Sequence, residues 1–149
     1  SEVWAACAAQ FVPLAQEKGL DLRFRPTAQV VDSDAMMLQS ILDNLVSNAV
    51  RYTERGRVLI AARPRGSEVE LQVWDTGPGI AAEHLPLIFV PYRRFDDRSA
   101  RHDEGQGLGL ALARGQADAL GHTLEVRSRP GHGSTFTVTV PRAGAPPRG

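Results

Sequence analysis

The segment from residue 30 to residue 53 constrains the fold most, because its apolar side chains recur at every third or fourth position. This spacing predicts an amphipathic helix with a single apolar face. The face consists of Leu38, Ile41, Leu42, Leu45 and Ala49. Asp32 or Ser33 can cap the first turn of this helix. Since one apolar face has to be buried against another layer, the remaining segments must supply that layer.

Those remaining segments predict a sheet and two further helices. Alternating apolar residues predict strands at residues 20–25, 57–63, 68–74, 123–128 and 134–140. Turn residues at 64–67 and 129–133 join two pairs of these strands into hairpins. Helices are predicted at residues 2–18, where Gly19 is the stop, and at 107–120, with a short helical turn at 81–89. We therefore expect an α+β fold, a two-layer α/β sandwich whose mixed, mostly antiparallel sheet is covered on one face by about three helices.

Length and composition fit one globular domain. The chain has 149 residues, of which 42% are hydrophobic. We expect the domain to span residues 1–141, with its packing ending near Val140. Residues 142–149 are rich in proline, glycine and arginine, so we expect a flexible tail or linker there.

Charge and cysteine content argue against several classes of function. Seventeen lysine and arginine residues balance 17 acidic residues, which gives no reason to expect nucleic acid or an anionic membrane surface as a partner. The single cysteine, Cys7, rules out an internal disulfide framework and a cysteine-based zinc site. No apolar run is long enough to span a bilayer and no signal peptide is visible. We therefore expect a cytoplasmic protein, or the cytoplasmic part of a membrane-bound receptor.

A glycine-rich stretch leads directly into the helix predicted at 107–120. Gly105, Gly107 and Gly109 alternate with other residues in "HDEGQGLGLALARG". The pattern is neither a dinucleotide fingerprint nor a P-loop, because it has no third glycine at the required spacing and the only lysine, Lys18, lies far away. Glycines before a helix can point backbone N–H groups at an anion. A flexible loop that only caps a core helix is the alternative.

Two asparagines interrupt the amphipathic helix. Asn44 and Asn48 are four residues apart and therefore share a face, which Arg51 and Tyr52 continue. Asparagine is unfavourable inside an apolar helix unless its amide has a partner. Either both amides bond to neighbouring backbone, or this face meets a polar ligand.

A second polar position lies where the third predicted strand ends. Asp75 is followed by Gly77 and Gly79 on either side of Pro78, which predicts a rigid turn. The aspartate can be a local cap of that turn. It can also be a carboxylate at the base of a pocket that accepts a hydrogen bond from a ligand amine.

Four motifs together resemble one family. "LDNLVSNAVRYT", "DTGPGI", "IFVPYRRFD" and "GQGLGLALA" are similar, in order and spacing, to the four boxes of the sensor histidine kinase catalytic domain, and "PGHGSTFTVTVP" resembles its closing hairpin. The resemblance covers the chain from about Val3 to Pro141. It implies the Bergerat-type ATP-binding fold of the superfamily shared with gyrase, heat-shock chaperones and mismatch-repair proteins. ATP and Mg²⁺ are then the expected ligands.

The resemblance also implies roles for the residues of the first two boxes. Asn48 matches the metal-binding asparagine, and an amide oxygen suits Mg²⁺. Asn44 lies near the same phosphate and metal cluster. Arg51 replaces the usual lysine and would contact phosphate, and Tyr52 would lie against adenine or ribose. Asp75 matches the aspartate that accepts from the exocyclic amino group of adenine.

Further nucleotide-binding positions follow from the other matches. They are Gly77, Gly79 and Ile80 in the turn, Phe89 and Tyr92 in the phenylalanine box, and Gly105, Gln106, Gly107, Leu108, Gly109 and Leu110 at the phosphates. Arg94 could reach the γ-phosphate or its acceptor and is expected to act in catalysis with Asn44 and Asn48, whereas Arg93 departs from the usual aromatic residue. The polar loop at 96–104 corresponds to a mobile lid over the nucleotide. His122 is expected to be a surface or turn residue, and His84 and His132 are expected to be structural.

The resemblance finally implies an enzyme that needs a second domain. The acceptor histidine of such kinases lies on a separate dimerisation domain, whose histidine pattern this sequence does not show. We therefore expect this ATP-binding domain to donate the γ-phosphate to that domain within a homodimeric bacterial parent protein. It would not phosphorylate itself. A response regulator would act downstream in the phosphorelay, without nucleic acid or direct membrane contact by this domain. The alternative is a nucleotide-binding regulatory module without transfer activity. An independent gyrase-like ATPase is disfavoured, because Asn44 stands where those relatives have a catalytic glutamate.

Overall fold

The structure, a computed structural model, describes residues 2–27, 31–90 and 109–143. Its helices are α1 (Glu2–Lys18), α2 (Ala35–Tyr52) and α3 (Gly109–Leu120), together with the short 3₁₀ helix η1 (Leu85–Leu87). Its strands are β1 (Asp21–Arg25), β2 (Arg57–Arg65), β3 (Glu68–Asp75), β4 (Thr123–Arg129) and β5 (Gly133–Pro141). No helix of these residues is long and apolar enough to cross a membrane.

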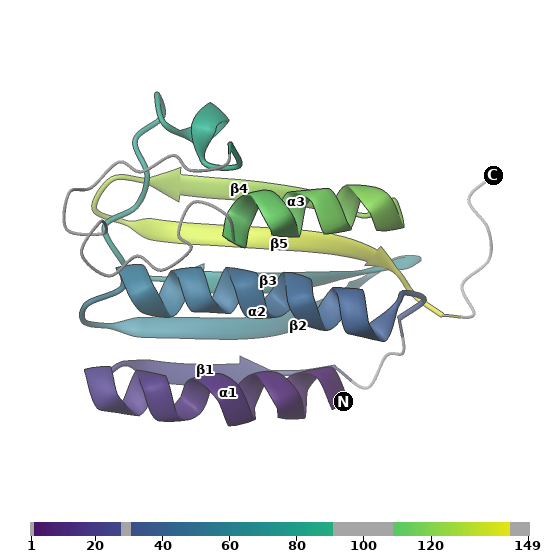
Figure 1. The fold of residues 1–149 in the computed structure, drawn as a ribbon, viewed down its shortest axis with the longest axis horizontal. Coiled ribbons are helices and arrows are strands. Elements are labelled where there is room, and N and C mark those ends of the chain that lie inside the picture. Colours follow the sequence, from purple (N-terminus) through teal and green to yellow (C-terminus); the bar gives the residue numbers. More distant parts are fainter. Residues whose placement is uncertain (1, 28–30, 91–108, 144–149) are drawn as a thin grey trace.

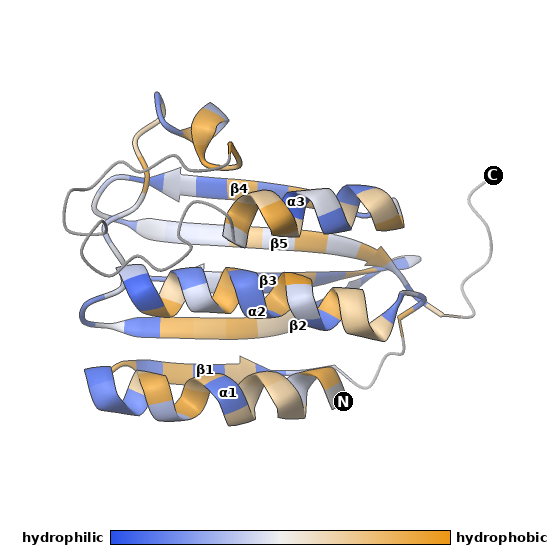
Figure 2. Cartoon of the chain, in the orientation of Figure 1, coloured by the Kyte–Doolittle hydropathy of each residue, from blue (hydrophilic) through white to orange (hydrophobic). Residues whose placement is uncertain are grey.

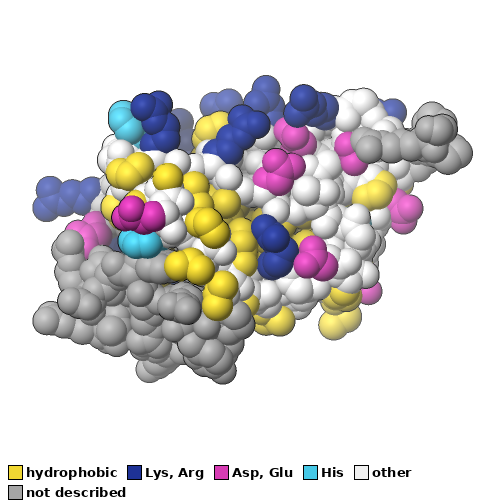
Figure 3. Space-filling model, turned by 90° about the horizontal axis from the view of Figure 1, so that it is seen from above, with side chains coloured by type: hydrophobic (Ala, Val, Ile, Leu, Met, Phe, Trp, Pro, Cys, Tyr) yellow, Lys and Arg dark blue, Asp and Glu magenta, His cyan; other side chains and the backbone are white. Residues whose placement is uncertain are grey.

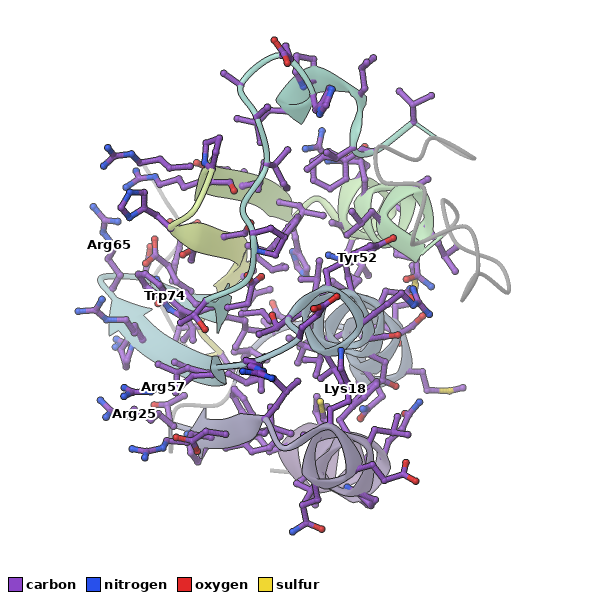
Figure 4. All side chains as sticks on the ribbon, turned by 90° about the vertical axis from the view of Figure 1, so that its left-hand side faces the viewer. Lys18, Arg25, Tyr52, Arg57, Arg65 and Trp74 are labelled. Atoms are coloured by element: carbon purple, nitrogen blue, oxygen red, sulfur yellow. The ribbon has the colours of Figure 1, made fainter. Side chains whose placement is uncertain are left out.

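The five strands form one sheet in the order β1-β2-β3-β5-β4, and the three α-helices lie side by side on one of its faces (Figure 1). β1 pairs with β2 in parallel, and the other neighbours pair antiparallel. The predicted two-layer sandwich with a mixed, mostly antiparallel sheet is confirmed. Within the described ranges, no helix lies on the opposite face of the sheet, and Arg25, Arg57, Arg65 and Trp74 lie on that side (Figure 4).

The core lies between the helices and the sheet. All five residues of the predicted stripe on α2 are buried, together with Val46 and Val50 of the same helix. Opposite them, alternate residues of the inner strands are fully buried, and β2 is hydrophobic over most of its length (Figure 2). They include Val58, Ile60, Val69, Val73, Phe136, Val138 and Val140. Each such side chain contributes about 1.5–3 kcal/mol on burial, so this interface fixes how α2 is placed on the sheet.

Two local details differ from the sequence prediction. Asp34, rather than Asp32 or Ser33, caps α2, because its extended backbone lets its carboxylate accept from the Met37 N–H at 2.9 Å. The hairpin turn is also tighter than predicted. β2 continues through Pro64 and Arg65, which pairs with Glu68, so only two residues turn the chain. Pairing with β1 stops at Ala61, and the free edge beyond it tolerates the proline.

The surface is uneven in charge. Seen from above (Figure 3), lysine and arginine side chains gather along one rim of the molecule, and hydrophobic side chains are exposed next to them. Leu112 on α3 is 52% exposed and Val90 is 37% exposed. These two residues lie on the elements that flank residues 91–108, which the structure does not describe.

Candidate functional site

Two of the predicted site residues, Asn44 and Gly109, meet where α2 and α3 run side by side. α2 and α3 run side by side over the sheet (Figure 1). A Cβ atom at Gly109, the first residue of α3, would lie 3.6 Å from Oδ1 of Asn44. The asparagine face of α2 is therefore turned toward the N-terminus of α3, where unsatisfied N–H groups and the helix dipole favour an anion.

The two asparagine amides have no protein partner within the described ranges. Asn44 and Asn48 are half-buried, and no hydrogen bond joins either side chain to a described residue. The interpretation in which both amides are satisfied by neighbouring backbone therefore finds no support in these contacts. Within the described part of the chain, both half-buried amides on this face of α2 therefore keep their capacity to bind a ligand.

The acidic neighbour of Asn44 points elsewhere. Asp43 accepts from Gln39 Nε2 at 2.9 Å, and burial raises its pKa from the ordinary value. Burial, with the Asp43 charge as the smaller cause, raises the pKa of the Cys7 thiol on α1 to about 12. Asp43 thus faces α1, about 100° around the helix from Asn44. The asparagine face itself carries no carboxylate from α2.

A cluster of polar atoms, the notch, lies at the C-terminal end of α2 and comprises Tyr52, Thr53, Asp75 and Gly77. Thr53 follows the last helical residue, is fully buried, and its hydroxyl has no hydrogen-bond partner among the described residues. A Cβ atom at Gly77 would lie 3.1 Å from that hydroxyl, 3.1 Å from Oδ1 of Asp75 and 3.3 Å from the Tyr52 carbonyl oxygen. A glycine at position 77 therefore lets these three oxygen atoms lie close together between the end of α2 and the end of β3.

Asp75 is the acidic residue of the notch. The Gly77 N–H donates to its Oδ1 at 2.9 Å, so the carboxylate does cap the turn. Burial raises the pKa of Asp75 above its ordinary value, and backbone hydrogen bonds from Gly77 and Ser134 oppose the rise. Further hydrogen-bond partners would favour the ionised form of this half-buried carboxylate. The bond from Gly77 therefore uses part of the hydrogen-bonding capacity of Asp75. Its role as an acceptor for a ligand amine stays a prediction.

The turn after Asp75 is docked on the β4–β5 hairpin. Gly79 has a positive φ of 76°, and a Cβ atom there would overlap the Arg129 carbonyl group. The Gly131 N–H donates to the Pro78 carbonyl at 2.7 Å, and the Ile80 N–H donates to Ser128 Oγ at 2.7 Å. This close approach fixes Asp75 relative to the sheet, which explains why Gly79 is required.

Phe89 links α3 to the sheet. Its ring meets Phe136 edge to face at 6.3 Å, and the Arg114 guanidinium lies 4.1 Å from its centroid. Arg114 also donates to the Leu124 carbonyl at 3.1 Å. Cation–π and aromatic contacts of this kind each contribute about 0.5–1.5 kcal/mol. The segment that precedes residues 91–108 is therefore held against α3 and β5.

Several predicted residues cannot be placed. Tyr92, Arg93, Arg94, Gly105, Gln106, Gly107 and Leu108, as well as the lid at 96–104, lie outside the described residues. Leu110 and Ile80 are half-buried and pack against the core.

One histidine prediction is wrong in part. His122 lies in the connection between α3 and β4, but it is not at the surface: it is 7% exposed and its Nε2 lies 2.7 Å from the Ser33 hydroxyl. Burial lowers its pKa, and the nearby Asp32 opposes this shift. The bond ties the start of β4 to the segment before α2, which is why Ser33 is not the cap. His132 is exposed and His84 is half-buried.

The chemistry of the notch limits what could bind there. Among the described residues, no group of three or more histidine, cysteine, aspartate or glutamate side chains could hold a metal ion. A cation at this site would need amide oxygens together with oxygens that a ligand brings. The site therefore suits a ligand with a basic or amine-bearing end at Asp75 and an anionic end at α3.

Comparisons with known proteins agree with this arrangement. Residues 33–144 match the family described as histidine kinase-, DNA gyrase B-, and HSP90-like ATPase. An uncharacterized sensor-like histidine kinase of Rhizobium meliloti is 39% identical over 95% of this chain and 27% of its own length. The sensor histidine kinase RcsC of Escherichia coli is 35% identical over 97% of this chain and 16% of its own length. The chain thus spans less than a third of these relatives.

Solved structures show the same fold. The catalytic domain of the histidine kinase ThkA superposes with a TM-score of 0.80, at 26% identity over 95% of this chain and 91% of that one. Full-length ShkA in complex with AMPPNP gives a TM-score of 0.79 at 32% identity, covering 98% of this chain and 30% of that chain.

Proposed function

Since the chain belongs to the histidine kinase-, DNA gyrase B- and HSP90-like ATPases and corresponds to the ATP-binding catalytic domain of sensor histidine kinases, we propose how its own residues bind and use the nucleotide. Mg-ATP lies between α2, the end of β3 and the N-terminus of α3. Its γ-phosphate passes to a histidine on another domain of the parent protein.

The notch carries this proposal, because it holds a buried hydroxyl without a described partner near a half-buried carboxylate. One Asp75 oxygen accepts from Gly77, and its remaining capacity suits the exocyclic amino group of adenine. Thr53 Oγ, which the structure leaves without a described partner, can bond a ring nitrogen or a bridging water. A guanine carbonyl would instead face the carboxylate, so the notch favours adenine.

The phosphates would then lie at the asparagine face. N–H groups at the start of α3 and the Arg51 guanidinium supply positive charge to the phosphates. The amide oxygen of Asn48, with Asn44 one turn away on the same face, would hold Mg²⁺, which fits a face of α2 without carboxylates. When bound, Mg²⁺ neutralises charge that develops on the phosphates during transfer. Tyr92, Arg94 and residues 105–108 keep their predicted roles at the γ-phosphate end.

The same residues favour transfer to histidine over hydrolysis. Attack by water needs a group that takes up a proton. Asn44 has no useful basicity, and Asp43 faces α1. An imidazole whose attacking nitrogen is unprotonated needs no such base: the nitrogen bonds to the γ-phosphorus, the bond to the bridging oxygen breaks, and ADP leaves. The acceptor therefore comes from the parent's dimerisation domain, in a homodimer that passes phosphate to a response regulator. We place this domain in the cytoplasm, where ATP is available.

Incubation with γ-labelled ATP tests the proposal. The chain is incubated alone and with a separately expressed acceptor-histidine domain from its parent protein. We expect label on the added domain, little free phosphate and none on this chain. Rapid phosphate release by the isolated chain, abolished in Asn48→Ala, would make it an independent ATPase. Intact ATP binding without transfer would show a regulatory module instead.

A further inference from the structure

The single lysine of the chain joins two helices at the edge of the site. Lysine and arginine together number 17, and Lys18 is the only lysine among them. From the last turn of α1, its ammonium donates to the Val50 carbonyl at 2.7 Å and to the Arg51 carbonyl at 3.0 Å. Figure 4 shows Lys18 extending from α1 toward the end of α2.

The Val50 and Arg51 carbonyls are in the last turn of α2, where carbonyl groups lack hydrogen-bond donors within the helix. The last four C=O groups of an α-helix have no partner within the helix. α2 ends at Tyr52, and the Thr53 N–H turns back to the Ala49 carbonyl at 3.1 Å. The Lys18 ammonium serves the next two carbonyls and also places a positive charge at the negative end of the helix dipole.

The contact suits lysine better than arginine. An ammonium is compact and has three donors that can rotate toward two adjacent carbonyls, whereas a guanidinium presents a planar fork. All other basic residues apart from the histidines are arginines, so the lysine at position 18 fits a contact with two adjacent carbonyl groups.

The backbone that Lys18 holds continues directly into the notch. It binds the carbonyl of Arg51, the next carbonyl belongs to Tyr52, and that oxygen would lie 3.3 Å from a Cβ atom at Gly77. The orphaned hydroxyl of Thr53 follows one residue later. A shift of the last turn of α2 would therefore move every α2 contribution to the adenine end of the site.

We propose that Lys18 is a positioning residue of the nucleotide site: by binding the Val50 and Arg51 carbonyls, it holds Arg51, Tyr52 and Thr53 where they meet the ligand. The inference rests on the proposed function, because it assumes that these residues bind nucleotide. Lys18 lies outside the part of the chain that matches the family, which begins at residue 33.

Three variants of the whole chain test this role. Lys18→Met keeps a linear apolar stem without a donor, and Lys18→Arg restores charge and donors. Trp4→Ala is the matched control, because it removes the edge-to-face contact with Phe24 from the other end of α1, about 21 Å away. Both Lys18→Met and Trp4→Ala should lower the melting temperature.

Titration with Mg-ADP and hydrogen exchange separate positioning from stability. We expect Lys18→Met to raise the Kd for ADP about three- to tenfold and to speed amide exchange at residues 50–54 without nucleotide. Lys18→Arg should recover part of both, and Trp4→Ala should change neither. The role of Lys18 would be overturned if Lys18→Met kept wild-type affinity and exchange, if Trp4→Ala weakened ADP binding equally, or if Lys18→Arg recovered neither. The proposed function would be unaffected by these results. No ADP binding by the wild type would overturn the proposed function as well.

Discussion

Replacing Asp75 by asparagine isolates its proposed contact with the nucleotide base. In the native structure, Oδ1 of Asp75 accepts from the Gly77 N–H at 2.9 Å. An asparagine at this position can keep that bond through its amide oxygen, which turns its NH₂ group toward the ligand. The turn therefore survives while the acceptor for the adenine amino group is lost. Asp75→Ala removes both interactions and measures their sum.

The expected loss follows from the charge of this half-buried carboxylate. A hydrogen bond to a charged group contributes about 1.5–3 kcal/mol, which corresponds to roughly a ten- to hundredfold change in affinity. Asp75→Asn should lose ADP affinity in this range, because two donors then face each other, and Asp75→Ala should lose at least as much, because the bond from Gly77 is lost as well. The new NH₂ group can donate to the guanine carbonyl, so the preference for ADP over GDP should shrink or reverse.

Calorimetric titration of each variant with Mg-ADP and Mg-GDP measures these changes. Asp118→Asn, the same chemical change at an exposed position on α3, is the matched control and should bind like the wild type. An ADP Kd for Asp75→Asn within about twofold of the wild-type value would refute the proposed base contact.

Four further predictions concern the site and its support. Asn48→Ala should weaken ATP binding in the presence of Mg²⁺ but change it little with EDTA, as titration in both buffers would show; an equal loss in both would contradict the metal role. Gly79→Ala should unfold the turn or strongly lower the melting temperature, because its Cβ would meet the Arg129 carbonyl group; a wild-type melting curve would refute that packing. Burial lowers the pKa of His122 from its ordinary 6.5, so the unfolded chain binds more protons and the free energy of unfolding should fall as pH drops below about 6.5. In denaturant titrations at pH 5.5 and 7.5, His122→Gln should reduce the difference in the free energy of unfolding between the two pH values. An unchanged difference would contradict this role of His122. Burial raises the pKa of Asp75 from 3.8, and ADP needs its ionised form, so ADP affinity should decline with falling pH before an ordinary aspartate titrates; constant affinity down to pH 4 in the folded protein would contradict this.

Periodic apolar residues made the fold predictable. The spacing on α2 identified its buried face, and strand alternation identified the sheet, because burial against a layer requires both patterns. The capping residue was harder to predict, since Asp32, Ser33 and Asp34 all suit a cap. The choice depends on His122, which binds Ser33 from 89 positions away in sequence. Sequence spacing carries no information about such a distant partner.

Thr53 shows what sequence reasoning missed at the site. Thr53 continues the apolar stripe of α2 four residues beyond Ala49. A hydroxyl at a position expected to be buried could have indicated a polar contact there. Only the tertiary contact with Gly77 shows that the hydroxyl lies beside Asp75. Lys18 was noted only as too distant to bind phosphate, because its contact with α2 depends on how the two helices pack.

Titration of the wild-type chain with Mg-ADP and Mg-GDP tests most directly the claim that α2, β3 and α3 form an adenine nucleotide site. The account predicts ADP binding in a one-to-one complex and GDP binding at least about tenfold weaker, as expected for one charged hydrogen bond. Equal affinity for the two nucleotides, or no binding of ADP, would contradict it.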